Sequence, residues 1–542
     1  MPELQAEAGQ QIRFDLRREK WIPVVREDGT HDEVGLLEVL GEAHQLREIR
    51  DPLPPVECGL QRLLVTFVLD IFQPRDATDW EELWNDGRFD EARIQKYFKE
   101  NADRFDLFDE AHPFLQSADA EGDDKPLAGL LPSQPAGTNA AHFQHGDEGA
   151  FAVSPAIAAR LLTTIAPFMT AGGAGLSPSI NGAPPWYVLP QGRNLFETIL
   201  LNCPVLEDLL TFASGDAPPA WRDERPIVKE DRTEAGLLES LTWRPRRIHL
   251  RPHLATNGRC ALSGRETPVL VSRMKFSAGW STRFEWRDPH VPYRIGKEGA
   301  TVLRPRDGRE IWRDVGALAL LRHTEASGRD VAFERPAVVT QFSKFAEDGL
   351  LREDVPLQLA IYGMRTDLKM KVFEWHRERL NLPAPLLWKQ QFHGTAENEM
   401  KRAEDVAYAL GRAIKHTYPR DGAGNDNAFE TLIARTHRDF WQRLRPHYTD
   451  APDSLLHRLA PLQPERDKDE IATAQSDWHK ALSQVARRVL DTAISGLDTD
   501  GEALKRQIEA RRNFEARLWA LLHPEAAAKK RKAKQQEKGE TV

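Results

Sequence analysis

The last third of the chain carries the clearest periodic pattern. From about Ala403 onward, apolar residues recur at three- and four-residue intervals in four stretches, the spacing that places side chains on one face of a helix. Prolines between positions 446 and 464, and glycines at 496 and 501, mark breaks in the pattern. We therefore expect a C-terminal four-helix bundle over residues 381–524. The four stripes are Val406, Leu410 and Ile414; Phe429, Leu432, Ile433, Phe440 and Leu444; Ile471, Trp478, Leu482, Val485 and Val489; and Leu504, Ile508, Phe514, Leu518 and Leu521.

The first 380 residues mix helical and strand patterns. Between Leu60 and Ile71 the apolar residues follow helical spacing. Residues 246–250 and 269–271 are typical of short strands. The proline-rich segment from 177 to 192 excludes a continuous helix or a central strand, because proline removes backbone donors. We predict an α+β fold: a large mixed α/β domain over residues 1–380, followed by the four-helix bundle.

Composition narrows the protein class further. The 542 residues carry a formal net charge of -9 and are 40% hydrophobic, so the chain is expected to fold. A mildly acidic chain is unlike the strongly basic histones that bind nucleic acid over their whole surface. A local basic groove that binds nucleic acid is not excluded. No run of 18 apolar residues occurs, no secretory pattern is visible and the three cysteines are far apart. We expect a cytoplasmic protein without a membrane partner.

Residues 525–542 form a basic, low-complexity tail. Lys529, Lys530, Arg531, Lys532 and Lys534 follow Pro524 closely. Such a composition favours a disordered, solubilising end, with a dedicated binding arm as the alternative.

Candidate catalytic motifs are weak. Residues 109–112 read Asp-Glu-Ala-His, as in helicase motors, but that chemistry needs a phosphate-cradling loop ending in Gly-Lys-Ser/Thr. Gly296-Lys297 is followed by Glu298 and lacks the upstream glycine spacing. We expect a chance resemblance in a loop, no catalytic residues and no cofactor.

A glycine-rich segment is the second candidate. Gly172, Gly173, Ala174 and Gly175 permit close backbone approach. The following Leu-Ser-Pro-Ser sequence does not suit the helix that a dinucleotide fingerprint requires. A loop that touches a ligand and a plain turn both stay open.

Metal ligation is not expected. Cys260 has a serine, Ser263, where a zinc knuckle needs its second thiolate.

Clusters of basic and aromatic residues recur along the mixed segment. They occupy residues 243–247, 273–287 and 364–371. Arginine and lysine suit phosphates, and planar rings offer stacking surfaces. Each cluster taken alone is within chance for a chain with 74 basic residues.

Taken in order, these local features resemble one family, the CasA-type large subunit of the type I-E CRISPR Cascade surveillance complex. The resemblance covers about the whole chain. Its motifs lie at residues 14–24, 34–40, 111–116, 138–143, 172–175, 194–202, 286–290 and 362–365.

The resemblance implies a non-catalytic subunit of an RNA-guided antiviral ribonucleoprotein. Such a subunit recognises the protospacer-adjacent motif (PAM) of target double-stranded DNA through the minor groove and helps to start R-loop formation. It then recruits the helicase-nuclease. The implied partners are the guide RNA, the target DNA, the backbone, small and handle-binding Cascade subunits, and the helicase-nuclease effector.

The resemblance also implies roles for particular residues. Phe143, with Gln144 and His145 in the loop after it, corresponds to the contact with the guide-RNA handle and a neighbouring subunit. Residues 172–175 correspond to the glycine loop at the PAM. Lys275 corresponds to a lysine that enters the minor groove, with Arg273 as its substitute.

A wedge that splits the duplex corresponds to Thr366, Asp367, Leu368 and Lys369. Leu368 stands where some relatives carry a glutamine. An apolar wedge can still unstack a base step, although the polar contact is lost.

Two rival functions stay open. Residues 109–112 suggest a nuclease or helicase, which ATP hydrolysis or DNA cleavage would reveal. A purely structural scaffold would bind partners through the helical bundle and show no salt-sensitive affinity for a duplex.

Overall fold

The computed structural model describes residues 12–131, 151–172, 175–205, 217–314, 322–326, 329–351, 357–367, 371–387, 392–418, 428–497 and 499–530. Its contacts form two compact units. The first comprises Met1–Pro305, Arg335–Phe345 and Gln358–Arg379, and the second Arg306–Glu334, Ala346–Leu357 and Leu380–Val542. The predicted domain boundaries, 1–380, 381–524 and 525–542, stay a prediction.

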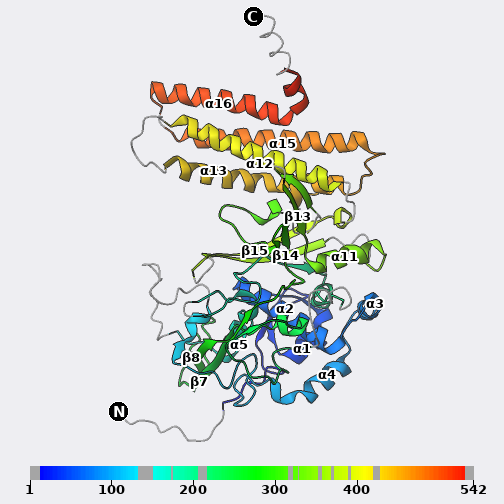
Figure 1. Ribbon diagram of the computed structural model, residues 1–542, viewed down its shortest axis with the longest axis vertical. Coiled ribbons are helices and arrows are strands. Elements are labelled where there is room, and N and C mark those ends of the chain that lie inside the picture. Colours follow the sequence, from blue (N-terminus) through cyan, green and yellow to red (C-terminus); the bar gives the residue numbers. More distant parts are fainter. Residues whose placement is uncertain are drawn as a thin grey trace, which may run out of the picture. The chain divides into compact units, whose positions relative to one another are not determined.

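A buried helix, α2, runs through the first unit (Figure 1). It spans Pro54–Phe72, begins with prolines in its first turn and ends at Gln73 in a left-handed conformation. The helix predicted between Leu60 and Ile71 is thus present, but polar residues on its other faces are buried as well. One of them, Arg62, pairs with Asp288 at 2.8 Å. Polar side chains of α2 therefore anchor later segments of the unit.

Short helices and a small sheet accompany α2. Strands β1, β2 and β3 form an antiparallel sheet in the order β2-β1-β3. The elements are β1 (Ile22–Arg26), β2 (His31–Val34), β3 (Leu46–Ile49), α1 (Leu36–Gly41), α3 (Ala77–Asp86), α4 (Glu91–Glu100), α5 (Pro155–Leu162), α6 (Ile165–Phe168), α7 (Leu195–Leu201), α9 (Leu237–Leu241) and α11 (Ala337–Glu347).

Three further strand groups carry the basic and aromatic clusters. The long antiparallel pair of β7 and β8 is extended by β4 in the order β4-β8-β7, and β6 pairs in parallel with β9. A third sheet has the order β15-β14-β5, which makes the proline-containing β5 an edge strand, as proline requires. The strands are β4 (Asp124–Pro126), β5 (Tyr187–Gln191), β6 (Glu230–Arg232), β7 (Arg246–Leu254), β8 (Val269–Ala278), β9 (Trp280–Thr282), β10 (Tyr293–Gly296), β11 (Gly299–Val302), β14 (Leu357–Thr366) and β15 (Val372–Leu382).

The second unit is mainly helical. Helices α12, α13, α15 and α16 lie side by side (Figure 1). This agrees with the predicted α+β fold and its helical C-terminal region, whereas the geometry of an exact four-helix bundle stays a prediction. The elements are β12 (Arg322–Ala326), β13 (Arg329–Glu334), α12 (His393–Thr417), α13 (Ala428–Arg445), α14 (Leu455–Leu459), α15 (Lys468–Ser495) and α16 (Gly501–Leu522).

The fourth predicted apolar stripe is only partly buried. Phe514 and Leu518 of α16 are buried, but Leu504 and Ile508 are exposed. The predicted stripe is wrong at these two positions, because six residues separate Ile508 from Phe514, which places them about 120° apart around the helix and on different faces.

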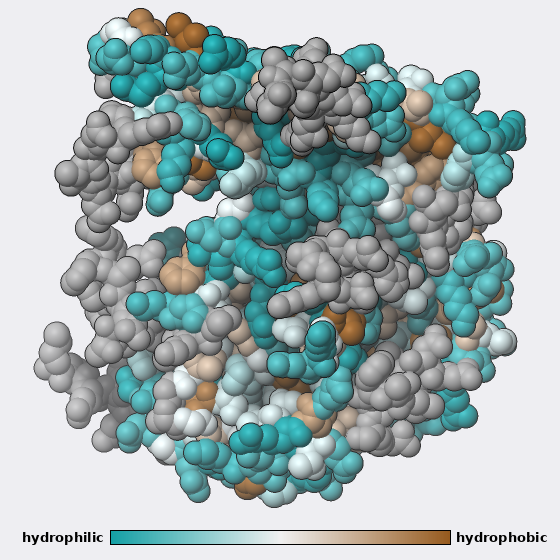
Figure 2. Space-filling model, turned by 45° about the horizontal axis from the view of Figure 1, so that its top comes forward, coloured by the Kyte–Doolittle hydropathy of each residue, from teal (hydrophilic) through white to brown (hydrophobic). Residues whose placement is uncertain are grey.

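Among the described helices, none is both long and apolar enough to cross a membrane. The face in Figure 2 is largely hydrophilic, with scattered apolar residues.

Candidate nucleic-acid interface

The two described parts of the glycine-rich segment meet after α6. The Gly172 N–H donates to the Leu176 carbonyl at 2.9 Å, which closes the turn. Gly175 has a φ of 81°, in the left-handed region that disfavours any side chain, and it is exposed. Gly173 and Ala174 lie outside the described residues. We call the described residues 170–172 and 175–177 the turn, and it presents exposed backbone at Gly175.

The turn is held from behind by Arg246, the first residue of β7. The guanidinium donates to the Thr170 carbonyl at 2.9 Å and also to the Ser177 carbonyl. These two acceptors stand at the two ends of the turn, so one side chain ties both ends together. Hydrogen bonds from a charged donor contribute roughly 1.5–3 kcal/mol each.

Arg246 is also an unusual buried charge. Its side chain lies over the Phe276 ring, 5.6 Å from the centroid, and only 4% of the residue is exposed. Among the described residues, no carboxylate pairs with it. Burial lowers the pKa of Arg246 to about 10, so the group still carries its charge at neutral pH. The turn thus has a positive charge behind it that is not neutralised by a described acid.

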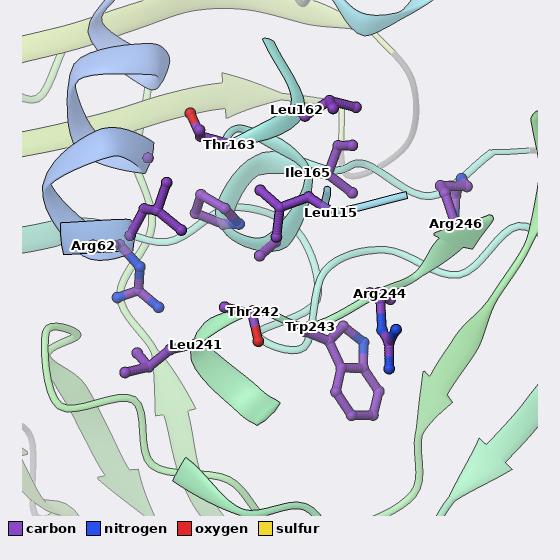
Figure 3. A pocket seen from close by; sticks show the side chains of 14 residues that line it. Arg62, Leu115, Leu162, Thr163, Ile165, Leu241, Thr242, Trp243, Arg244 and Arg246 are labelled. Atoms are coloured by element: carbon purple, nitrogen blue, oxygen red, sulfur yellow. The ribbon is translucent and has the colours of Figure 1, made fainter. Parts of the chain in front are cut away.

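A small cavity that Arg246 lines is also lined by two more arginines (Figure 3). Its volume is about 30 Å³, room for a water molecule but not for a nucleotide. In Figure 3, Arg244 and Arg246 stand on one side and Arg62 on the other. Arg244 pairs with Asp223, and Arg62 with Asp288. Arg246 is the one of these three without a described acidic partner.

Lys275 stands on the other face of the hairpin from Arg246. In the β7–β8 register, Lys275 pairs with His249, whereas Arg246 pairs with Ala278. Residues directly opposite share a face and neighbours along a strand alternate, so the two cations point to opposite sides of the sheet. The Lys275 ammonium donates to the Gly122 carbonyl at 2.6 Å and lies 3.7 Å from Asp124.

Lys275 has basic neighbours on this outer face. Arg247, Arg251 and Arg273 share it with Lys275, since they occupy the same alternating positions of β7 and β8. Arg273, the predicted substitute, donates to the Asp124 carbonyl at 2.8 Å. The role predicted for Lys275 stays a hypothesis. If it holds, the lysine and the glycine turn contact a duplex from different faces of the β7–β8 pair.

The predicted wedge lies at the end of the β14–β15 hairpin. Thr366 ends β14, and Asp367 follows it. The Asp367 N–H donates to the Lys371 carbonyl, and the Lys371 N–H donates to Asp367 Oδ1, both at 3.1 Å. Asp367 therefore closes the tip. Leu368 and Lys369 lie outside the described residues.

The base of this hairpin is fixed by buried polar contacts. The Tyr362 hydroxyl donates to Glu57 Oε1 at 2.7 Å and accepts from Gln61 at 3.1 Å. On the adjacent strand, Arg377 pairs with Glu57 at 2.9 Å. These contacts anchor the strands of the hairpin to α2.

The predicted handle contact cannot be placed, because Phe143, Gln144 and His145 lie outside the described residues. The helicase-like motif forms a loop. Asp109 Oδ1 accepts from the backbone N–H groups of Ala111 at 2.9 Å and His112 at 2.8 Å. The carboxylate is therefore engaged in shaping its own turn.

The Gly296-Lys297 segment and Cys260 also lie in short turns. Gly296 pairs with Gly299 across the β10–β11 hairpin, which places Lys297 in a two-residue turn. Cys260 begins a tight turn in which the Gly264 N–H donates to its carbonyl at 2.9 Å. Within the described ranges, no three His, Cys, Asp or Glu side chains gather to hold a metal ion.

Two residues of the turn's surroundings were not predicted as site residues. Arg246 was visible only as part of a basic cluster and a strand. Lys229 gave no signal in sequence, yet a Cβ built on Gly175 would lie 2.7 Å from its Nζ. Contacts between segments this far apart in the chain depend on tertiary structure, so no local pattern could have revealed them.

Comparison with known proteins gives the family. Residues 15–489 match the family described as CRISPR-associated protein Cse1. The chain belongs to this family. The curated CasA/Cse1 protein of Thermus thermophilus is 31% identical over 417 residues, covering 74% of this chain and 77% of that protein. The predicted resemblance to the CasA-type large subunit is thereby confirmed.

Solved structures of similar fold agree. Cse1 from Acidimicrobium ferrooxidans has a TM-score of 0.75 at 23% identity, covering 95% of this chain and 99% of that one. A crystal structure of CasA from Thermus thermophilus has a TM-score of 0.72 at 24% identity, covering 94% and 99%. A chain of a CRISPR RNA-guided surveillance complex has a TM-score of 0.61 at 19% identity, covering 89% and 99%. At these identities the structures show the common fold of this Cse1 family member.

Proposed function

We propose that this Cse1 family member is the non-catalytic large subunit of a type I-E CRISPR Cascade complex. It recognises the PAM of target double-stranded DNA through the minor groove, helps to initiate the R-loop and recruits the helicase-nuclease. Its partners are the guide RNA, the target DNA, the other Cascade subunits and the helicase-nuclease. Family membership and the surveillance-complex chain of similar fold support this assignment.

The observation that carries the proposal is the exposed turn with a buried, unneutralised guanidinium behind it. The minor groove is only about 6 Å wide, and a turn without bulky side chains fits so narrow a space. A·T and T·A pairs present nearly the same acceptors there, and G·C adds one amino donor. A turn that contacts the groove through its backbone therefore accepts several related PAM sequences. Most of the sequence discrimination is left to base pairing between the guide RNA and the target.

The tip of the β14–β15 hairpin supplies the next step of the proposed function, the separation of the DNA strands. A tip closed by Asp367 and supported on α2 can insert beside the motif without folding back. Leu368 is then the apolar group that unstacks the first base step, at a cost of a few kcal/mol that protein–DNA contacts offset.

Co-expression tests this proposal. The chain is produced with a guide RNA and the other subunits, and the purified complex is titrated with duplexes that carry or lack the motif. We expect co-purification with the RNA and salt-sensitive, motif-dependent binding. Failure to associate, or association without any duplex affinity, would favour a scaffold. ATP hydrolysis or magnesium-dependent cleavage by the isolated chain would favour the enzyme.

A further inference from the structure

Lys229 is linked to the group of strands that includes β7, whose first residue, Arg246, holds both ends of the turn. It directly precedes β6, and β6 pairs in parallel with β9 from Glu230↔Trp280 onward. Strand β9 follows β8, the partner of β7, and the Trp280 N–H donates to the Arg244 carbonyl at 3.0 Å. Lys229 is therefore held by the same group of strands that positions Arg246.

The ammonium of Lys229 lies against the exposed side of the turn. A Cβ on Gly175 would stand 2.7 Å from Nζ and 3.3 Å from Cε of this lysine. Lys229 is itself exposed. The cation and the bare backbone are thus presented together at the surface, while Arg246 lies beneath.

Lys229 is not neutralised by a described acid. Its neighbour Glu230 lies 3.7 Å from Arg232, and Asp231 pairs with Arg283 at 3.0 Å. No carboxylate of the described residues lies within ion-pair distance of Nζ. By contrast, Lys275 is bound to a carbonyl and lies close to Asp124. The turn is therefore flanked by two cations that no described acid neutralises, Lys229 at the surface and Arg246 buried beneath it.

We propose that Lys229 is a phosphate-binding residue, which holds a phosphodiester of the target duplex against the exposed backbone at Gly175. The inference rests on the proposed function and adds a second cation to it. An ammonium is a compact point charge suited to a phosphate oxygen. Glycine leaves room for the strand to approach, and the charge of Arg246 adds to the attraction. Lys229 is thus a positioning residue, and base reading falls to the turn.

The assembled complex tests this role. Lys229→Ala and Lys229→Arg are compared with Lys297→Ala, which removes the same charge from the exposed β10–β11 turn. Affinities for motif-bearing and scrambled duplexes are measured from 50 to 200 mM salt. For Lys229→Ala we expect similar weakening on both duplexes, and a salt slope lower by about 0.9, the value of one phosphate contact. The arginine variant and Lys297→Ala keep the wild-type slope.

Other results would overturn the inference. An unchanged slope for Lys229→Ala excludes a phosphate contact, and a loss confined to the motif-bearing duplex makes Lys229 a base reader instead. The proposed function has a test of its own. A wild-type complex that binds the motif-bearing and scrambled duplexes equally contradicts motif reading. Even then, the salt dependence of affinity in Lys229→Ala still tests the phosphate contact. A wild-type complex without DNA affinity contradicts both. Thermal unfolding of each variant checks that the fold is intact, and we expect wild-type midpoints for these surface substitutions.

Discussion

Buried charges in this protein divide into those with acidic partners and those without. Arg62, Asp288 and His290 form a buried group, in which Arg62 donates to both other side chains at 2.8–2.9 Å. Burial opposes ionisation of Asp288, but Arg62 holds the pKa of that carboxyl well below its ordinary value. Among the acids that the structure describes, Arg246 has no such partner. The charge of Asp288 is balanced within its buried group, whereas the charge of Arg246 is solvated by the Thr170 and Ser177 carbonyls and holds the turn from behind.

A pH dependence follows from His290. Its Nδ1 faces the Arg62 donor at 2.8 Å, and its Nε2 faces the Asn202 carbonyl at 3.1 Å, so the ring is neutral with its proton on Nε2. Burial lowers the pKa of His290 below 6.5. The unfolded chain therefore binds the proton more tightly, and stability is lost as pH falls below about 6.5, by at most about 1.4 kcal/mol per pH unit for this group.

Urea unfolding between pH 7.5 and 5.5 measures this effect. We expect His290→Gln to lose less stability than wild type over that interval, even if it is less stable at pH 7.5. His31→Gln, at an exposed position of β2, is the control and should follow wild type. An equally steep pH dependence in His290→Gln would show that this histidine does not titrate as described.

At the scale of elements, the sequence reveals where helices and strands lie but not what faces them. The helix over α2, the strands β7 and β8 and the long C-terminal helices were predictable, because periods of 3.6 and 2 residues are local properties. The face on which Lys275 lies depends on the pairing register with β7 and β4. The exposure of Ile508 depends on which side of α16 packs against the other helices. Both are tertiary facts, and the sequence could not supply them.

Helix α16 offers a matched pair of substitutions. Phe514 is 2% exposed and Ile508 is 67% exposed. Phe514→Ala should lower the free energy of unfolding by about 3–5 kcal/mol through lost burial and a cavity. Ile508→Ala should change it by no more than about 0.5 kcal/mol. Denaturant unfolding measures both, and losses of equal size would contradict the burial of only one side of α16.

The wedge hairpin gives a prediction of its own. Asp367→Ala removes the acceptor for the Lys371 N–H and loosens the tip. One hydrogen bond contributes about 1 kcal/mol, so strand separation should slow roughly fivefold. Motif binding should stay near wild type. The fluorescence of a base analogue placed next to the motif reports strand separation.

The control for this variant is another hairpin aspartate. Asp28 caps the β1–β2 turn by accepting from the Thr30 N–H at 2.9 Å. Asp28→Ala should separate strands at the wild-type rate. If both variants slow equally, the effect reflects general loosening and not the wedge.

At the scale of the whole molecule, an acidic chain carries a local basic site. The net charge of -9 repels nucleic acid in general. Against that background, the exposed turn with Arg246 and Lys229 beside it is a place where we propose that a duplex is attracted. The basic outer face around Lys275 is another, although Asp124 neutralises part of it. General repulsion combined with local attraction suits the proposed function, in which DNA that lacks the motif must be released.

Comparison of two glycine substitutions in the assembled complex tests the central claim most directly. Gly175 and Gly29 both have left-handed backbones, with φ of 81° and 84°, but Gly29 lies in the β1–β2 turn. Alanine strains each turn similarly, and only at position 175 does it also meet Lys229. The measured quantity is the ratio of affinities for motif-bearing and scrambled duplexes. We predict that Gly175→Ala lowers this ratio about tenfold, a loss of about 1.4 kcal/mol in discrimination, and that Gly29→Ala leaves it unchanged. A wild-type ratio in Gly175→Ala would contradict the account.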